Sequence, residues 1–515
     1  MTGHAQTAMD APFRTDHLVG DLERRSIRAG GITIAAQVVK PVIQIGSTMA
    51  LARLLTPVDF GLIAMVMAVT GFSAMFKEAG LSMATIQRAE VTHEQVSTLF
   101  WINVALSFLI MAVLMALAPV IAWFYSEPQL IWVTIAVAGT ILFGGLVIQH
   151  EAILKRQMRF GRLAAIDIAS MAAGIPVGVG MAFAGFGCWS LVGMMATTAM
   201  VRCALVWIAA RWRPGRFVRG CGVRSMLAFG AHLTGSRFME YINQNVASVL
   251  IGWALGPMTL GFYSKAYSLV LMPMRQINWS LSAVAIPSFS RLQNEPERFR
   301  AFYLRVLQSV CLLAAPVIAL SFADADRIIL LVLGSQWMES ATLFRWLAPA
   351  ALIGTLHAAP DWLMVSLGHP RKLLRWSLLS TPLTVIAIAV GIKWGADGVA
   401  AAISIMSVAL FLPMSWYATR NSPVPFPSLL NVLWRPIIMS IAAAVVLMQV
   451  REPLTESLIL PVQLVLDSIV FMITFLLVGM ILPGGRAMLG DAVRLFGELR
   501  RKRTLPTPDS EDGNT

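Results

Sequence analysis

The sequence predicts an all-α polytopic membrane protein with about 14 transmembrane helices, in two pseudo-symmetric six-helix lobes plus two extra C-terminal helices. Apolar stretches recur between residues 30 and 482. Each is long enough to cross a bilayer, because roughly 20 residues at 1.5 Å rise cover a hydrocarbon core of about 30 Å. Of the 515 residues, 57% are hydrophobic and only 13% are charged. A soluble domain could not bury so large an apolar share.

The predicted spans are separated by short polar or basic connections. They cover residues 30–52, 60–82, 97–124, 129–150, 163–184, 187–209, 226–252, 259–286, 302–322, 340–366, 373–392, 396–417, 430–449 and 461–482. The apolar run 328–333 is too short to cross, so residues 323–340 are expected at the interface or as an extension of the next helix. No cleavable signal peptide is expected, since residues 1–25 lack an apolar segment.

Basic residues are concentrated in every second connection, which indicates the orientation of the chain in the membrane. One set of connections carries most of them, including the clusters at 155–162, 211–224 and 494–503. The opposite set holds little beyond Arg53, Arg327, Lys393 and Arg451. Because cytoplasmic connections carry the excess of Lys and Arg, both termini are predicted to be cytoplasmic. An even number of spans likewise places both termini on one side of the membrane.

An internal repeat becomes visible when the chain is shifted by 200 residues. Leu55, Pro57 and Gly61 then align with Leu255, Pro257 and Gly261. The Pro and Gly pairs mark the same helix-turn-helix punctuation in each half. A period of six spans is even, so the two copies are expected to have parallel orientation. The predicted divisions are a cytoplasmic tail at 1–25, an N-lobe at 26–213, a C-lobe at 224–420, two further helices at 421–483 and a basic cytoplasmic tail at 484–515.

Five sequence blocks together point to a known family. They are ARLLTPVDFG at 52–61, LKRQMRF at 154–160, GFGCWSL at 185–191, the segment from LGP to GFYSKA at 255–266, and IPSFSR at 286–291. With these blocks the chain resembles the polysaccharide-transporter branch of the multidrug/oligosaccharidyl-lipid/polysaccharide exporter superfamily, close to colanic-acid exporters of the Wzx kind. The resemblance extends from about residue 25 to 485.

This resemblance implies a flippase of the bacterial cytoplasmic membrane that works by alternating access between two lobes. Its cargo would be lipid-linked oligosaccharide repeat units on a carrier of the undecaprenyl diphosphate type, for exopolysaccharide or lipopolysaccharide biosynthesis. The expected partners are this cargo and membrane lipids, with assembly proteins left open. No enzymatic activity, cofactor, metal or nucleic acid is expected, and coupling to a proton or sodium gradient is left open.

Ionisable residues inside predicted spans are the candidates for the cargo site. A charged side chain at bilayer depth costs on the order of 2.5–3.5 kcal/mol on insertion scales, so it is expected to face a cavity. Such residues fall in corresponding spans of the two halves: Lys40, Lys77, Glu78, Arg237, Glu240, Lys265 and Arg275, with the amides Gln37, Gln44 and Gln244 nearby. The cations would attract the diphosphate of the carrier, and the amides would bond sugar hydroxyls.

A purely structural role is the alternative for several of these residues. Lys77 stands beside Glu78, and Arg237 with Glu240 has i,i+3 spacing, so each pair can neutralise itself within the bundle. Arg275 and Lys77 can also extend toward the cytoplasmic interface.

Three other functions, in two classes, are alternatives to the first. A lipid II flippase or a multidrug/cation antiporter belongs to the same superfamily, but an antiporter needs an acidic cavity, whereas the candidate wall here is cationic in excess. A membrane-embedded polysaccharide polymerase would need carboxylates on a large external loop. Apart from the termini, no connection here exceeds about 20 residues, a length set by the predicted span limits.

Overall fold

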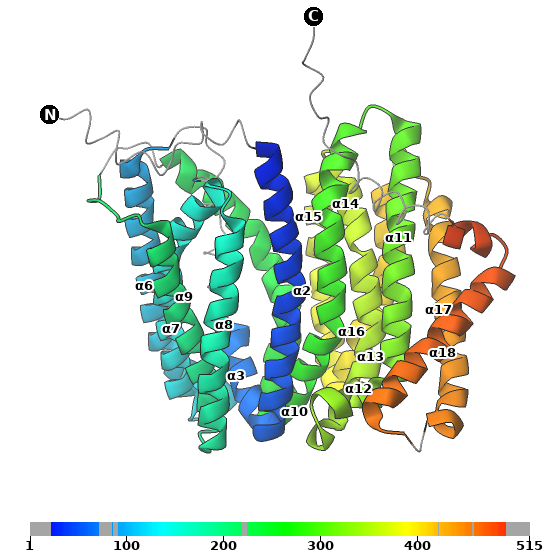
Figure 1. Cartoon of the computed structure of the whole chain (residues 1–515), viewed down its shortest axis with the longest axis horizontal. Helices are drawn as coiled ribbons and strands as arrows, with labels where there is room; N and C mark the ends of the chain where they lie inside the picture. The colour runs from blue at the N-terminus through cyan, green and yellow to red at the C-terminus, as the bar shows by residue number, and fades with distance from the viewer. Residues whose placement is uncertain are drawn as a thin grey trace, which may run out of the picture. The chain divides into compact units, whose positions relative to one another are not determined.

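The computed structural model describes residues 22–71, 85, 91–218, 224–420, 422–455 and 458–490. None of these residues lies in a β-strand. The elements are α2 (Leu22–Leu54), α3 (Pro57–Thr70), α6 (His93–Tyr125), α7 (Leu130–Arg156), α8 (Phe160–Phe183), α9 (Trp189–Ala210), α10 (Arg224–Arg291), α11 (Pro296–Ala323), α12 (Ala325–Val332), η3 (Ser335–Trp337), α13 (Glu339–Leu356), α14 (Ala358–Ser366), α15 (Pro370–Gly391), η4 (Ile392–Trp394), α16 (Gly395–Thr419), α17 (Phe426–Thr455) and α18 (Leu460–Ile481) (Figure 1).

Every predicted span overlaps a helix, which confirms the all-α polytopic fold class. The span at 60–82 can be followed only to residue 71. Within the described part of the chain, nine helical stretches are long and apolar enough to cross a membrane. Tyr241–Asn278 overlaps the predicted spans 226–252 and 259–286, and Arg371–Thr419 contains both 373–392 and 396–417, so the nine stretches account for eleven predicted spans. The other three spans, 30–52, 60–82 and 340–366, overlap α2, α3 and α13 with α14.

The turn between α2 and α3 is determined by local sequence. Thr56 caps α3: its Oγ1 accepts a hydrogen bond from the Asp59 backbone N–H, and the Asp59 carboxylate accepts from the Thr56 N–H at 2.9 Å. Pro57 occupies the first helical turn, where a missing N–H costs nothing. This reciprocal capping box satisfies backbone donors that a helix start would otherwise leave unpaired.

The seventh and eighth predicted spans form one element, α10, with a break in the middle. Gly256 has φ +80° and ψ 178°, a conformation that residues with a Cβ rarely adopt. The break therefore stands directly before Pro257, just as the α2–α3 turn stands before Pro57.

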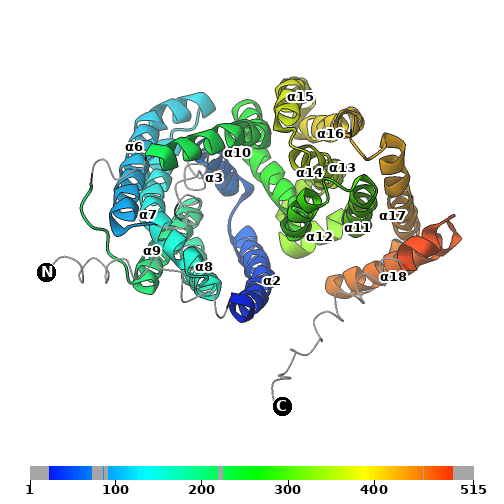
Figure 2. The ribbon, with the colours of Figure 1, turned by 90° about the horizontal axis from the view of Figure 1, so that it is seen from above.

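The described helices divide into two compact units. Unit 1 contains the chain up to Lys265 together with Val332–Ser340 and Thr381–Ala402. Within it α6, α7, α8 and α9 run side by side, and α2 packs along α8 (Figure 2). Most of their outer side chains are apolar and exposed, as expected of helices that face lipid.

Unit 2 contains Ala266–Leu331, Ala341–Ser380 and the chain from Ile403 onward. Its core gathers Phe289 from α10, Phe299 and Tyr303 from α11, and Trp362 from α14. A second cluster holds the last two helices: Met439 and Leu447 of α17 and Phe471 of α18 pack beside Ala323, the last residue of α11. The two C-terminal helices are thus fixed to α11 by apolar contacts.

Candidate functional site

Four charged side chains from four helices of unit 1 form a continuous chain. Lys40 of α2 donates to the Asp167 carboxylate of α8. Arg202 of α9 lies 3.1 Å from the other Asp167 oxygen and donates through Nε to Glu151 of α7 at 2.9 Å. Lys40 and Arg202 remain 34% and 41% exposed, whereas both carboxylates are 19% exposed. We call these four residues the Lys40 network.

The Lys40 network is electrically neutral, with two cations and two carboxylates. Neutrality reduces the cost of holding four ionisable groups within helices that cross a membrane. Both cations also keep exposed surface, so each can contact a further group without leaving its carboxylate. Lys40 and Arg202 are therefore paired in this structure yet still accessible.

The polar face of α2 continues on either side of Lys40. Gln37 precedes it by three residues and Gln44 follows it by four, so the three side chains share one face of the helix. Gln37 is half-buried and Gln44 is exposed. This row offers one ammonium group between two amides, a combination able to contact both an anion and hydroxyl groups.

The structure places the other predicted site residues in different settings. Lys265 of α10 lies with its Nζ 3.7 Å from the centre of the Phe60 ring. Gln244 and Arg275 are exposed on α10. Lys77 and Glu78 lie outside the described residues, as do the side chains of Arg237 and Glu240, whose backbone belongs to α10. The structure thus locates Lys40, Gln44, Gln244, Lys265 and Arg275 only.

Sequence reasoning missed the partners of Lys40. Asp167, Glu151 and Arg202 are not among the residues predicted for the site. The available signal was that the predicted spans at 163–184 and 187–209 each contain a charged residue of opposite sign, Asp167 and Arg202. Opposite charges in neighbouring spans predict an ion pair, because neither is stable alone in lipid.

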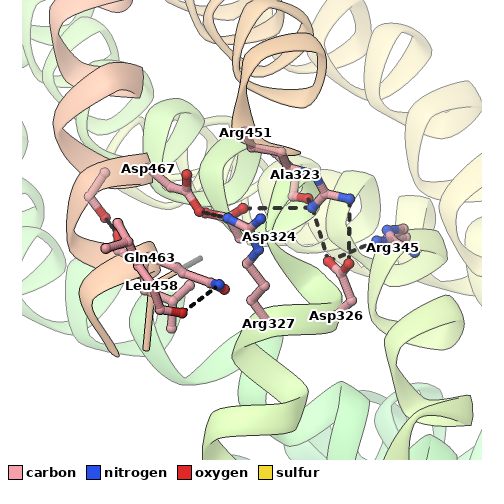
Figure 3. Close-up of polar contacts among 11 residues, drawn as sticks. Ala323, Asp324, Asp326, Arg327, Arg345, Arg451, Leu458, Gln463 and Asp467 are labelled. Atoms are coloured by element: carbon pink, nitrogen blue, oxygen red, sulfur yellow. Dashed lines mark hydrogen bonds and ion pairs between the residues drawn. The ribbon is translucent and has the colours of Figure 1, made fainter. Parts of the chain in front are cut away.

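A second ionic cluster occupies unit 2, where the end of α11 and α12 meet α17 and α18 (Figure 3). Arg327 donates to Asp467, whose side chain is only 1% exposed. Arg451 donates to the Ala323 carbonyl at 2.7 Å and lies 3.1 Å from Asp326. The complete cluster balances three carboxylates with three guanidinium groups: Asp324, Asp326, Asp467, Arg327, Arg345 and Arg451. We call it the Asp326 network.

The Asp326 network connects helices rather than presenting free charge. It joins the far end of α17 and the first half of α18 to the segment that follows α11. Because the same helices share an apolar core, the network adds a polar attachment to an apolar one. These contacts attach the two last helices to the segment after α11.

Asp324 differs from its neighbours in the Asp326 network. Neither of its carboxylate oxygens accepts a hydrogen bond from the described part of the chain, although Arg451 lies 3.8 Å away. Burial and the nearby charge of Asp467 raise the pKa of Asp324 to about 7, while Arg327 and Arg451 act in the opposite direction and Asp326 adds to the increase. The charge of this group therefore changes near neutral pH.

This pKa predicts a pH-dependent stability. Between the ordinary pKa of aspartate and about 7, folded Asp324 holds a proton that the unfolded chain releases, so stability falls as pH rises through that window. Asp324→Asn should remove this pH dependence. The drop in unfolding temperature between pH 5 and pH 8 should therefore be smaller in the variant than in the unchanged chain, by on the order of a few degrees. Thermal unfolding in detergent at both pH values measures the effect.

Asp326→Asn is the matched control. Burial alone would raise the pKa of Asp326, but the hydrogen bond from Arg451 and the charges of Arg451 and Arg345 hold it below its usual value. Its carboxylate is thus charged at both pH values, and its loss should lower stability at both. An Asp324→Asn protein with the same pH profile as the unchanged chain would contradict the prediction.

The chain is similar to known proteins of polysaccharide biosynthesis. The model of a family described as polysaccharide biosynthesis protein matches residues 50–342. The chain is 27% identical over 400 residues to the succinoglycan biosynthesis transport protein ExoT of Rhizobium meliloti, covering 77% of this chain and 80% of that protein. It is 24% identical over 405 residues to the lipopolysaccharide biosynthesis protein WzxC of Escherichia coli, covering 77% and 81%.

A solved structure shares the fold. The lipid II flippase MurJ, in an inward closed conformation, superposes with a TM-score of 0.70 at 12% identity, covering 88% of this chain and 98% of MurJ. At that identity the likeness concerns the arrangement of helices and not the cargo.

Proposed function

Because the chain belongs to the polysaccharide biosynthesis protein family, we propose that it is a flippase that moves lipid-linked oligosaccharide repeat units across the cytoplasmic membrane of a bacterium. The carrier lipid would be of the undecaprenyl diphosphate type. The observation that carries the proposal is the alignment, over 400 residues, with a protein described as a succinoglycan biosynthesis transport protein. Helices long and apolar enough to cross a membrane are compatible with transport.

The Lys40 network supplies the chemistry that such a cargo needs. The anionic head of the cargo would approach the exposed part of Lys40 and form a charge-assisted bond. Gln37 and Gln44 lie on the same face of α2, where amide groups could meet the sugar hydroxyls. Asp167 would then keep Arg202 as its partner. Arg237 is a second cation proposed for the same head, by its place in the corresponding span of the other half.

Removal of the gene from its host tests the proposed function. Surface polysaccharide should disappear while lipid-linked repeat units accumulate in the cytoplasmic leaflet, and restoring the gene should reverse both changes. Repeat units that still reach the outer leaflet would contradict a flippase. Joining of repeat units by the purified protein would indicate a polymerase, and export of cationic drugs without cargo would indicate an antiporter.

The proposed orientation places both termini in the cytoplasm, which yields a prediction for six positions. Single cysteines in a background without native cysteines should react with a membrane-impermeant thiol reagent added outside at Glu127, Asp397 and Glu452. They should be protected until the membrane is opened at Arg159, Arg216 and Arg371. The reason is the excess of basic residues in the set of connections that contains Arg159, Arg216 and Arg371. A reversed result at any of the six positions contradicts this orientation.

A further inference from the structure

Two copies of one motif contact each other inside unit 1. A methyl group placed on Gly61 would overlap the backbone carbonyl of Pro257, and one placed on Gly261 would overlap the carbonyl of Pro57. The contacting residues are related by the same shift of 200 positions as the sequence repeat. We call this backbone-to-backbone contact the glycine crossing. Only glycine at residues 61 and 261 allows it, because any Cβ there would meet backbone that cannot rotate away.

A short segment from later in the chain fills the space beside the glycine crossing. Val332–Ser340 belongs to unit 1 although the residues before and after it belong to unit 2. It contains η3, whose Trp337 is fully buried, with ring centres 5.4 Å from Phe60 and 5.9 Å from Phe262. Ser340 donates to the Phe262 carbonyl at 3.0 Å. The segment therefore contacts both copies of the repeated motif.

The same segment caps the end of α2. Trp337 Nε1 donates to the Ala52 carbonyl at 2.8 Å, and Gln336 Nε2 donates to the carbonyls of Ala52 and Leu55, the latter at 3.2 Å. The last carbonyls of a helix have no partner within the helix. Here donors more than 280 positions away in the sequence satisfy them.

The hydrogen bonds and the backbone contact are of a kind that can separate and form again. Helix-end carbonyls can bond water when their side-chain donors leave, and the contact at Gly61 and Gly261 is made by backbone alone. Trp337 must also leave its packing beside Phe60 and Phe262. Lys265 above the Phe60 ring adds an attraction that does not require a fixed geometry. Breaking the assembly therefore does not require any helix to unfold.

We propose that the glycine crossing and the segment Val332–Ser340 together form the gate that closes one end of the transport path, with Gln336 and Trp337 as its latch. The inference rests on the proposed function, since alternating access needs each end of the path to close in turn. On the predicted orientation, α2 ends at the outer face, so this gate is the outer one. Release of Gln336 and Trp337 from the α2 carbonyls would precede its opening.

A buried cysteine next to the latch reports the state of the gate. Leu55 is 2% exposed, so Leu55→Cys, in full-length protein with the four native cysteines replaced, should react slowly with an impermeant maleimide while the gate is closed. Gln336→Ala combined with Trp337→Phe keeps the aromatic packing but removes both donors. Each lost hydrogen bond shifts an equilibrium by roughly two- to twelvefold, so labelling should accelerate by on the order of tenfold or more.

Glycine variants test the crossing independently of the latch. Gly61→Ala and Gly261→Ala should each accelerate labelling of Leu55→Cys and lower export at matched folded protein. Gly46→Ala and Gly139→Ala are the controls, because a Cβ at either helical position meets nothing within 4 Å, and they should change neither measurement.

The two readouts separate the gate from the proposed function. Labelling is measured without cargo, so a chain that exports no polysaccharide would still show the accelerated reaction if the gate exists. Unchanged labelling in the latch variant and in both crossing variants, with normal amounts of folded protein, would overturn the gate. If the crossing variants do not fold, the latch variant decides.

Discussion

Replacing Arg327 with alanine is expected to lower the free energy of unfolding by about 3–5 kcal/mol, because it leaves Asp467 charged and buried without its partner. The Asp467 side chain is 1% exposed and that of Arg327 is 13% exposed. The measurement is thermal unfolding in detergent, together with the fraction of protein that remains folded after purification.

Two controls distinguish the loss of charge pairing from a general effect of truncation. Arg298 of α11 pairs with Glu295 at 2.7 Å, but these side chains are 75% and 47% exposed, so Arg298→Ala should change stability little. Arg327→Met with Asp467→Leu removes both charges and should recover most of the lost stability. If the double variant is as unstable as Arg327→Ala, the buried charge is not the cause.

The sequence contained enough information to predict the succession of helices. Apolar length and basic connections depend on local composition, and the bilayer restricts spanning segments to regular structure, so span limits are readable directly. The capping box at Thr56 and Asp59 is equally local, since both partners lie within four residues. The Pro57 and Pro257 repeat also indicated where α10 would break.

The partners of charged residues could not be predicted in the same way. Hydropathy indicates the depth of Lys40 in a span but not its rotation about the helix axis, and that rotation determines whether it meets Asp167 or an open cavity. Because an ionisable group is costly in lipid, Lys40 was expected to need a partner. Which neighbouring helix supplies that partner depends on tertiary packing. The predicted cargo site thus contained Lys40 but not its partner Asp167.

The segment at 323–340 also combines local features that could be predicted with long-range contacts that could not. Its apolar run was predicted to be too short to span the membrane, and the segment forms the short helices α12 and η3. Its contacts with Ala52 and Phe262 connect positions 78 to 285 residues apart, and no local pattern encodes such a separation. Arg327 and Arg451, which come from connections far apart in the sequence, belong to one ionic network (Figure 3).

Replacing Lys40 with alanine is expected to reduce polysaccharide export by roughly 10- to 100-fold at matched protein level. The change removes the cation proposed to hold the anionic head of the cargo, and a hydrogen bond to a charged group is worth about 1.5–3 kcal/mol. Folding should suffer less, because Asp167 keeps Arg202 at 3.1 Å. Export is measured as surface polysaccharide, and folded protein by its elution from a sizing column.

Removing both charges separates a cargo contact from a structural pair. Lys40→Met with Asp167→Asn removes the cation from the face of α2 that carries Gln37 and Gln44, and it leaves Arg202 paired with Glu151 at 2.9 Å. If Lys40 only neutralises Asp167, this double variant should recover export. If the cation must stand on the polar face of α2, export should stay low while folded protein returns. Near-normal export in Lys40→Ala itself would remove this residue from the cargo site.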